Sequence, residues 1–196
     1  MKLKKLVLVI LFSIFVSNFS QAKDPSLLIK EIVDEASNIL SSSDSIEIKI
    51  IKLNDIAEKN VDIDGIGMYT LGKYRKTVSE EEKIKYKKLF KKYFLKSFSS
   101  RLSDYTDPKI NVISQEKLNE KYTIVSSVLM ATEKKPEVNI QWRVYTKNPD
   151  QPLIRDLIIE GLSLARTQKE EFNSVIQSNE GDIDSLFINL KKFIES

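Results

Sequence analysis

The feature that most constrains this chain is a long amphipathic segment within residues 79–102. Ser79 followed by Glu82 has the pattern of a capping box, so we expect a helix to begin there. Apolar and aromatic residues then recur at steps of three and four, which places them on one helical face, while lysines occupy the opposite face. Such a helix must lay its aromatic face on the core, a partner or a ligand.

The first 22 residues have the three-part form of a secretory signal peptide. Lys2, Lys4 and Lys5 precede an apolar run, and the small residues Ser20 and Ala22 precede a cleavage point. The run is too short for a stable membrane anchor. We therefore expect cleavage after Ala22 and one exported domain over residues 23–196, with a retained anchor as the less favoured alternative.

Net charge and cysteine content restrict the possible ligands and the possible sources of stability. The chain has 31 basic and 28 acidic residues, but residues 1–22 hold three lysines and no acid, so the expected mature chain is neutral. A neutral chain gives no support for nucleic-acid binding. Because the chain has no cysteine, no disulfide can stabilise the exported domain, and its stability must come from burial.

The periodicity of the remaining chain predicts helices, then strands, then helices. Cap patterns at Asp24-Pro25, Asp44 with Glu47, Thr167 with Glu170, and Asp182 predict four helix starts, and Gly72 is a candidate left-handed cap after a short helix. Four strands are expected, over residues 109–115, 121–132, 138–145 and 153–160.

The strand patterns define the expected fold class. Residues 138–145 alternate between apolar and polar, which predicts one solvent-exposed face. Residues 121–132 have β-branched and apolar residues on both faces, which predicts a strand buried on both sides. Short polar connections predict antiparallel pairing. We expect an α+β domain in which helices cover one face of a curved four-stranded antiparallel sheet, with the aromatic helix facing that sheet.

Residues suited to catalysis are scarce. The chain has neither histidine nor cysteine, so the usual general base, the usual soft metal ligands and the thiol nucleophile are missing. The acids Glu80, Glu81 and Glu82 belong to a first helical turn, where they favour the helix dipole. We expect no enzyme, no cofactor and no metal; a hydrolase would need a buried carboxylate pair in a cleft.

Basic residues are concentrated between residues 73 and 101, a stretch that contains eleven lysines and arginines but three acids. This excess is either a docking surface for an acidic partner or lipid head group, or simply a solvated helix face. The docking candidates are Lys73, Arg75, Lys87, Lys88, Lys91 and Lys92.

Two segments carry a family resemblance. Residues 71–105, with an LG-basic-aromatic stretch before the capped helix, and residues 160–172, EGLSLARTQKEEF, resemble the two signatures of the MlaC family, the periplasmic toluene-tolerance proteins. The order, spacing and N-terminal segment agree as well. The chain departs from the family at Arg75, where tryptophan is usual, at Pro152-Leu153, where a Trp-Lys pair is usual, and at Lys169, where arginine is usual.

The resemblance implies a periplasmic phospholipid carrier that maintains outer-membrane lipid asymmetry. Its implied partners are an outer-membrane lipoprotein complex and an inner-membrane ABC transporter with an MCE-domain subunit, and we expect the protein to be a monomer. The acyl chains would occupy an apolar pocket between the helices and the sheet. The expected wall is Ile66, Leu71, Phe90, Phe94, Phe98, Ile124, Val128, Val138, Ile140, Trp142, Val144 and Ile158. The competing interpretation is an exported adaptor with a filled core that docks through residues 79–102 and carries no lipid.

Overall fold

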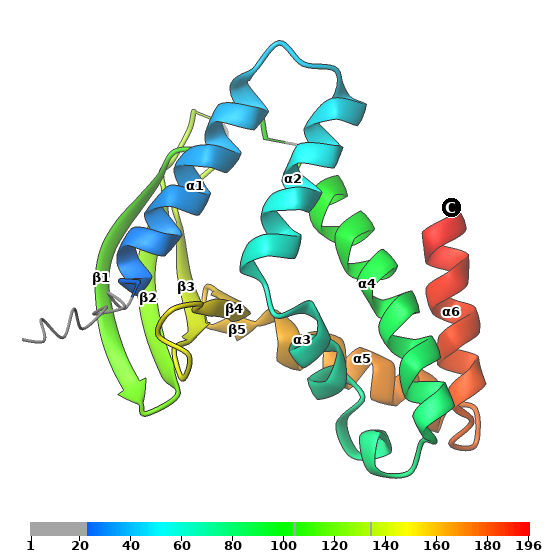
Figure 1. Ribbon diagram of the computed structural model, residues 1–196. Coiled ribbons are helices and arrows are strands. Elements are labelled where there is room, and N and C mark those ends of the chain that lie inside the picture. Colours follow the sequence, from blue (N-terminus) through cyan, green and yellow to red (C-terminus); the bar gives the residue numbers. More distant parts are fainter. Residues whose placement is uncertain (1–22, 104, 134) are drawn as a thin grey trace, which may run out of the picture.

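A computed structural model describes residues 23–103, 105–133 and 135–196 (Figure 1). The predicted signal peptide, residues 1–22, lies outside the described residues. Within the described ranges, no helix has both the length and the apolar character needed to span a bilayer. The elements are α1 (Pro25–Ser41), α2 (Ile46–Asn60), α3 (Ile63–Thr70), the 3₁₀ helix η1 (Gly72–Lys76), α4 (Glu80–Leu102), β1 (Ile110–Asn119), β2 (Tyr122–Leu129), β3 (Val138–Tyr145), β4 (Leu153–Ile159), β5 (Leu162–Ser163), α5 (Leu164–Gln177) and α6 (Ile183–Glu195).

The predicted α+β class is confirmed, with one correction to the sheet. The strands pair antiparallel in the order β1-β2-β3-β4-β5, so each strand lies beside its sequence neighbour. The sheet has five strands rather than four. The fifth, β5, is two residues long, which is too short for a period of two to be visible in the sequence.

Strand β2 is buried on one face only, and the prediction of burial on both faces is wrong. Thr123, Val125 and Ser127 are buried, whereas the alternate residues from Tyr122 to Val128 are half-buried. Cross-strand partners share a face, and Val125 lies opposite Trp142 while Ile124 lies opposite Arg143. The face that carries Ile124 is therefore apolar in β2 but polar in β3.

Helix α1 lies along the other face of the curved sheet (Figure 1). Its N-terminus is capped as predicted, because the Asp24 side chain accepts a hydrogen bond from the Leu27 N–H and Pro25 takes the first helical position. The apolar side of α1 packs on the strands and on Ile56 of α2. We call this core the sheet cluster: Leu28, Ile29, Ile32, Val33, Ile56, Val125, Val144 and Ile154.

The remaining helices form a second core. The aromatic face of α4 packs against α3, α5 and α6, and α4 and α6 run side by side (Figure 1). The expectation that this face would lie on the sheet is therefore wrong, because other helices cover it. We call this core the helical cluster: Ile63, Ile66, Leu71, Tyr86, Phe90, Ala165, Phe172, Ile176, Leu186, Phe187 and Leu190.

Two of the predicted capping boxes are wrong and one is confirmed. Ser79 and Glu82 exchange both hydrogen bonds of a capping box at the start of α4. Helix α2 instead begins at Ile46, and Asp44 forms an ion pair with Lys52. Helix α5 begins at Leu164 rather than near Thr167, because the Ser163 hydroxyl already accepts the Arg166 N–H.

Polar contacts join the two clusters at the start of β4. The Asp62 N–H donates to the Ile154 carbonyl over 2.9 Å, and the Arg155 guanidinium contacts the Asp62 carboxylate at 2.6 Å. The other Asp62 oxygen accepts the Gly65 N–H and so caps α3. One acidic side chain thus links the edge of the sheet to the first helix of the helical cluster.

Candidate functional site

The structure places the twelve predicted wall residues in four different environments. Ile66, Leu71 and Phe90 belong to the helical cluster and are almost completely buried. Phe90 has ring neighbours on several sides, with centroid distances of 5.7 Å to Tyr86 and 6.3 Å to Phe172. These three side chains are therefore already surrounded by protein, and they act here as packing residues.

The second group lies on the sheet face that α1 covers: Val138, Ile140, Trp142 and Val144. Val144 is completely buried beneath α1, whereas Val138 and Trp142 are half-buried. The Trp142 indole N–H donates to the Ser127 hydroxyl over 2.8 Å, and that hydroxyl contacts the Ile140 carbonyl at 3.3 Å. The Trp142 indole and the Ser127 hydroxyl are thus both hydrogen-bonded within this face.

The same face extends onto β4 through two residues that the sequence did not single out. Leu157 pairs with Trp142 and Ile159 pairs with Ile140, and both side chains are half-buried. The sequence of β4 reads LIRDLII, and its last three residues are all apolar. A run of apolar residues has no alternation from which to tell which side chains lie on which face of the sheet. The assignment of Leu157 and Ile159 to this face therefore comes from the strand register.

The third group, Ile124, Val128 and Ile158, lies on the opposite sheet face. Their cross-strand partners are Arg143, Asn139 and Gln141, all of them polar. The sheet itself thus separates these residues from the second group, and the twelve residues do not converge on a single wall.

The fourth group is the C-terminal half of the aromatic face of α4. Phe94 and Phe98 stack with a centroid distance of 6.1 Å and an interplanar angle of 7°. Phe94 packs at the margin of the helical cluster, and both rings stay half-buried. They are the part of the aromatic stripe that other helices leave incompletely covered.

The predicted basic surface is partly neutralised. Lys87 pairs with Asp64 at 3.0 Å, and Lys91 pairs with Glu58 at 2.7 Å. Lys88 and Lys92 are exposed and have no carboxylate partner within the described part of the chain. Lys73 and Arg75 lie on η1, away from these pairs.

Buried polar groups are few among the described residues. Asp156 is the one buried carboxylate there, at 4% exposure, and it accepts hydrogen bonds from the Ser163 hydroxyl and the Ala165 N–H and pairs with Arg143 at 3.3 Å. Tyr86 and Thr70 share a buried hydrogen bond of 2.7 Å. Burial raises the pKa of Tyr86 despite this bond. The described ranges show no group of three or more acids that could hold a metal ion.

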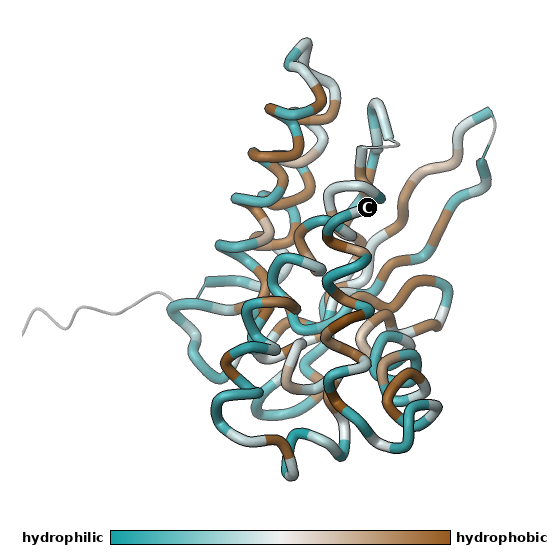
Figure 2. Tube along the Cα trace, turned by 90° about the vertical axis from the view of Figure 1, so that its right-hand side faces the viewer, coloured by the Kyte–Doolittle hydropathy of each residue, from teal (hydrophilic) through white to brown (hydrophobic). Residues whose placement is uncertain are grey.

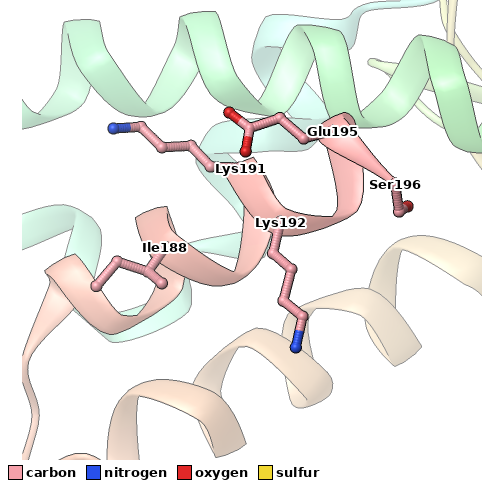
Figure 3. Close-up of a pocket in the computed structure, with 5 residues that line it drawn as sticks. All are labelled: Ile188, Lys191, Lys192, Glu195 and Ser196. Carbon is pink, nitrogen blue, oxygen red and sulfur yellow. The ribbon is translucent and has the colours of Figure 1, made fainter.

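Two surface hollows lie away from the predicted wall. One, of about 490 Å³, lies on α6 beside Ile188, Lys191, Lys192, Glu195 and Ser196 (Figure 3). The other, of about 460 Å³, lies where η1 meets α5.

The apolar candidate surface is instead the half-buried sheet face together with the end of α4. Along the α1–α2 hairpin near this surface, hydrophobic and polar residues are interspersed (Figure 2).

Comparison with solved structures shows that the fold is known. A phospholipid-binding protein from Ralstonia solanacearum, solved in complex with a phospholipid, matches with a TM-score of 0.73 and 18% sequence identity, over 88% of this chain and 98% of that chain. The molecule therefore shares its fold, an α+β domain with helices on one side of a curved antiparallel sheet. A search of curated proteins gave no significant sequence match.

The family follows from a separate comparison. The family model described as MlaC protein matches residues 30–192, so the chain belongs to the MlaC family. This confirms the resemblance that residues 71–105 and 160–172 indicated.

Proposed function

We propose that this protein is a non-catalytic phospholipid carrier of the periplasm. The observation that carries the proposal is the match of nearly the whole described domain to the MlaC family, together with the fold it shares with a protein solved with bound phospholipid. In this proposal residues 1–22 direct export. The partners are an outer-membrane lipoprotein complex and an inner-membrane ABC transporter with an MCE-domain subunit, and the exchange maintains outer-membrane lipid asymmetry.

The physical reason for a carrier is the cost of exposing acyl chains to water. A two-tailed lipid has on the order of 30 methylenes, each worth roughly 0.8 kcal/mol, so transferring its tails into water costs about 20 kcal/mol. A protein that encloses the tails removes this cost. Enclosure needs apolar side chains rather than catalytic groups, and the half-buried sheet face and the end of α4 supply them.

We infer that the tails contact the α1-covered sheet face and the C-terminal half of α4. Of the predicted wall, Phe94, Phe98, Val138 and Trp142 are half-buried on these two surfaces, and Ile140 lies between Val138 and Trp142 on the same sheet face. These five residues are proposed for this role, with Leu157 and Ile159 added from the register. Half-buried apolar side chains gain further burial when an acyl chain covers them, whereas Phe90 and Leu71 have little surface left to bury.

Native mass spectrometry of the mature protein, purified without detergent, tests this proposal. A stoichiometric adduct that organic extraction identifies as phospholipid is expected. A bare protein that also takes up no lipid from phosphatidylethanolamine and phosphatidylglycerol vesicles would overturn the proposal and favour the adaptor with a filled core.

A matched pair of variants on α4 tests the location. Phe98→Glu places a charge on the half-buried stripe, and we expect the protein to fold but to lose its lipid. Ile84→Glu makes the same kind of change at a side chain that is 57% exposed on the same helix, and lipid should remain bound. Circular dichroism confirms the fold of both variants. Equal lipid retention in the two would contradict the proposed contact surface.

A further inference from the structure

A group of cations gathers at the corner where η1 meets α5. Lys73, Arg75 and Lys76 of η1 are exposed, and none of them has a carboxylate partner within the described ranges. On α4, by contrast, Lys87 and Lys91 are tied to acids of neighbouring helices. Among the described residues, η1 therefore carries three exposed cations with no carboxylate partner, a group separate from the unpaired Lys88 and Lys92 of α4.

Gly72 brings this short helix close to α5. Its φ of 56° is left-handed, and a Cβ at this position would lie 2.8 Å from the Asn173 side-chain nitrogen and 3.3 Å from Cε of Lys169. Only glycine permits this approach without strain. The close contact sets Lys73 beside Lys169, two residues that are 96 positions apart in the sequence.

The approach leaves a hollow of about 460 Å³ with lysines on both sides. It is lined by Lys73, Lys169, Glu170, Asn173, Ser174 and Gln177. The Lys73 ammonium lies 5.2 Å from the Tyr74 ring centroid, and the Lys169 ammonium lies 5.4 Å from the Tyr69 centroid. Ring contacts position these ammonium groups but do not neutralise them, so a single lining acid, Glu170, opposes them.

We propose that this hollow binds an acidic segment of a protein partner. Carboxylates of such a segment would pair with Lys73 and Lys169, with Arg75 and Lys76 adding long-range attraction. Ser174 and Gln177 supply side-chain donors and acceptors suited to a peptide backbone. A membrane surface fits less well, because the side chains that line the hollow are all polar or charged and none is a large apolar group that could insert into a bilayer.

This docking surface is separate from the proposed lipid surface, so it does not rest on lipid carriage. Its residues come from η1 and α5, whereas the lipid surface comes from α4 and the sheet. The corner can therefore be altered without touching Phe98 or Trp142.

Fluorescence anisotropy with a short labelled peptide of alternating glutamate and serine tests the proposal. The wild-type protein should bind at low salt and should lose affinity when ionic strength rises to about 0.3 M. The double variant Lys73→Glu with Lys169→Glu should bind at least about tenfold more weakly. Its bound phospholipid, measured on the same preparation, should be unchanged.

The matched control is Lys88→Glu with Lys92→Glu, which makes the same change in net charge on the exposed side of α4. It should alter peptide affinity by less than about twofold. Equal losses in both double variants would show that only net charge matters and would overturn the site. Vesicles of equal phosphatidylglycerol and phosphatidylcholine serve as the second probe. Vesicle binding that depends on Lys73 and Lys169, without peptide binding, would overturn the peptide proposal in favour of a bilayer.

Discussion

The two cores of this molecule are built from different kinds of side chain. The helical cluster centres on aromatic rings that contact one another, such as Phe90 with Phe172 and Tyr86 with Phe187. The sheet cluster is entirely aliphatic. The half-buried Trp142 packs against it, and the buried polar residue Ser127 lies on the same sheet face. The comparison teaches that the helical cluster has little apolar surface left to bury, while the sheet face still has some beyond α1.

The largest expected effect is on the helical cluster. Phe90→Ala removes a ring that is 2% exposed, and we expect a loss of about 3–5 kcal/mol in the free energy of unfolding. Leu157→Ala, on the half-buried sheet face, should cost less than about 2 kcal/mol because part of its surface already faces solvent. Urea unfolding followed by circular dichroism measures both. Equal losses of unfolding free energy in the two variants would contradict the view that the helical cluster is more completely buried than the sheet face.

The contact between the two regions gives the next effect. Asp156→Ala leaves the Ala165 N–H, the Ser163 hydroxyl and the Arg143 guanidinium without their acceptor, and we expect a loss of about 2–3 kcal/mol. Asp156→Asn retains one acceptor oxygen and should cost less. Amide hydrogen exchange at Ala165 should accelerate in the alanine variant. Unchanged exchange there would show that Asp156 does not hold the start of α5.

A smaller effect concerns the buried hydroxyl pair of the helical cluster. Thr70→Val leaves the Tyr86 hydroxyl without its side-chain partner and should cost about 1–2 kcal/mol. Adding Tyr86→Phe removes the stranded hydroxyl, so the double variant should recover part of the loss. A double-mutant cycle from urea unfolding measures the coupling, and strictly additive losses would argue against a shared hydrogen bond.

The same tyrosine predicts a pH dependence. Because burial raises the pKa of Tyr86 in the folded protein, the phenol of the unfolded chain ionises first as pH rises through about 10. The free energy of unfolding should therefore fall above that pH, and Tyr86→Phe should lessen this fall. Urea titrations at several alkaline pH values provide the test. If the unfolding free energy of the variant falls with pH as steeply as that of the wild type, Tyr86 is not the cause.

The smallest expected effect is at the surface of α4. Lys91→Ala removes an exposed ion pair with Glu58 and should change the unfolding free energy by less than about 1 kcal/mol. Lys88→Ala, which removes no ion pair within the described residues, should change it less still. Thermal unfolding at low and high salt measures both variants, and a salt-independent loss at Lys91 would show that its methylenes matter more than its charge.

The sequence predicted individual elements well where a local signal determines them. Ser79 with Glu82 correctly marked the start of α4, because both hydrogen bonds of a capping box lie within four residues. The alternation in residues 138–145 matched the observed strand β3. Asp44 failed as a cap because Ser45 lies nearer the first helical turn and Lys52 pairs with the carboxylate.

The partners of each face could not be predicted from the same signals. Periodicity shows that one side of α4 must be covered, but the covering elements α5 and α6 follow only after the whole sheet, within residues 164–195. Ile124 and Val128 are apolar like Val125, so their position on the other face follows only from the pairing with Arg143 and Asn139. The approach of η1 to α5 at Gly72 likewise has no local signal.

The intrinsic fluorescence of Trp142 can report lipid binding. It is the single tryptophan of the chain, and its indole lies half-buried on the sheet face, bonded to Ser127. Emission excited selectively in the indole band therefore comes from one place, the surface proposed to contact acyl chains. Phospholipid brominated along its tails should quench that emission, whereas lipid brominated in the head group should not, so occupancy and depth can be followed in the unlabelled wild-type protein.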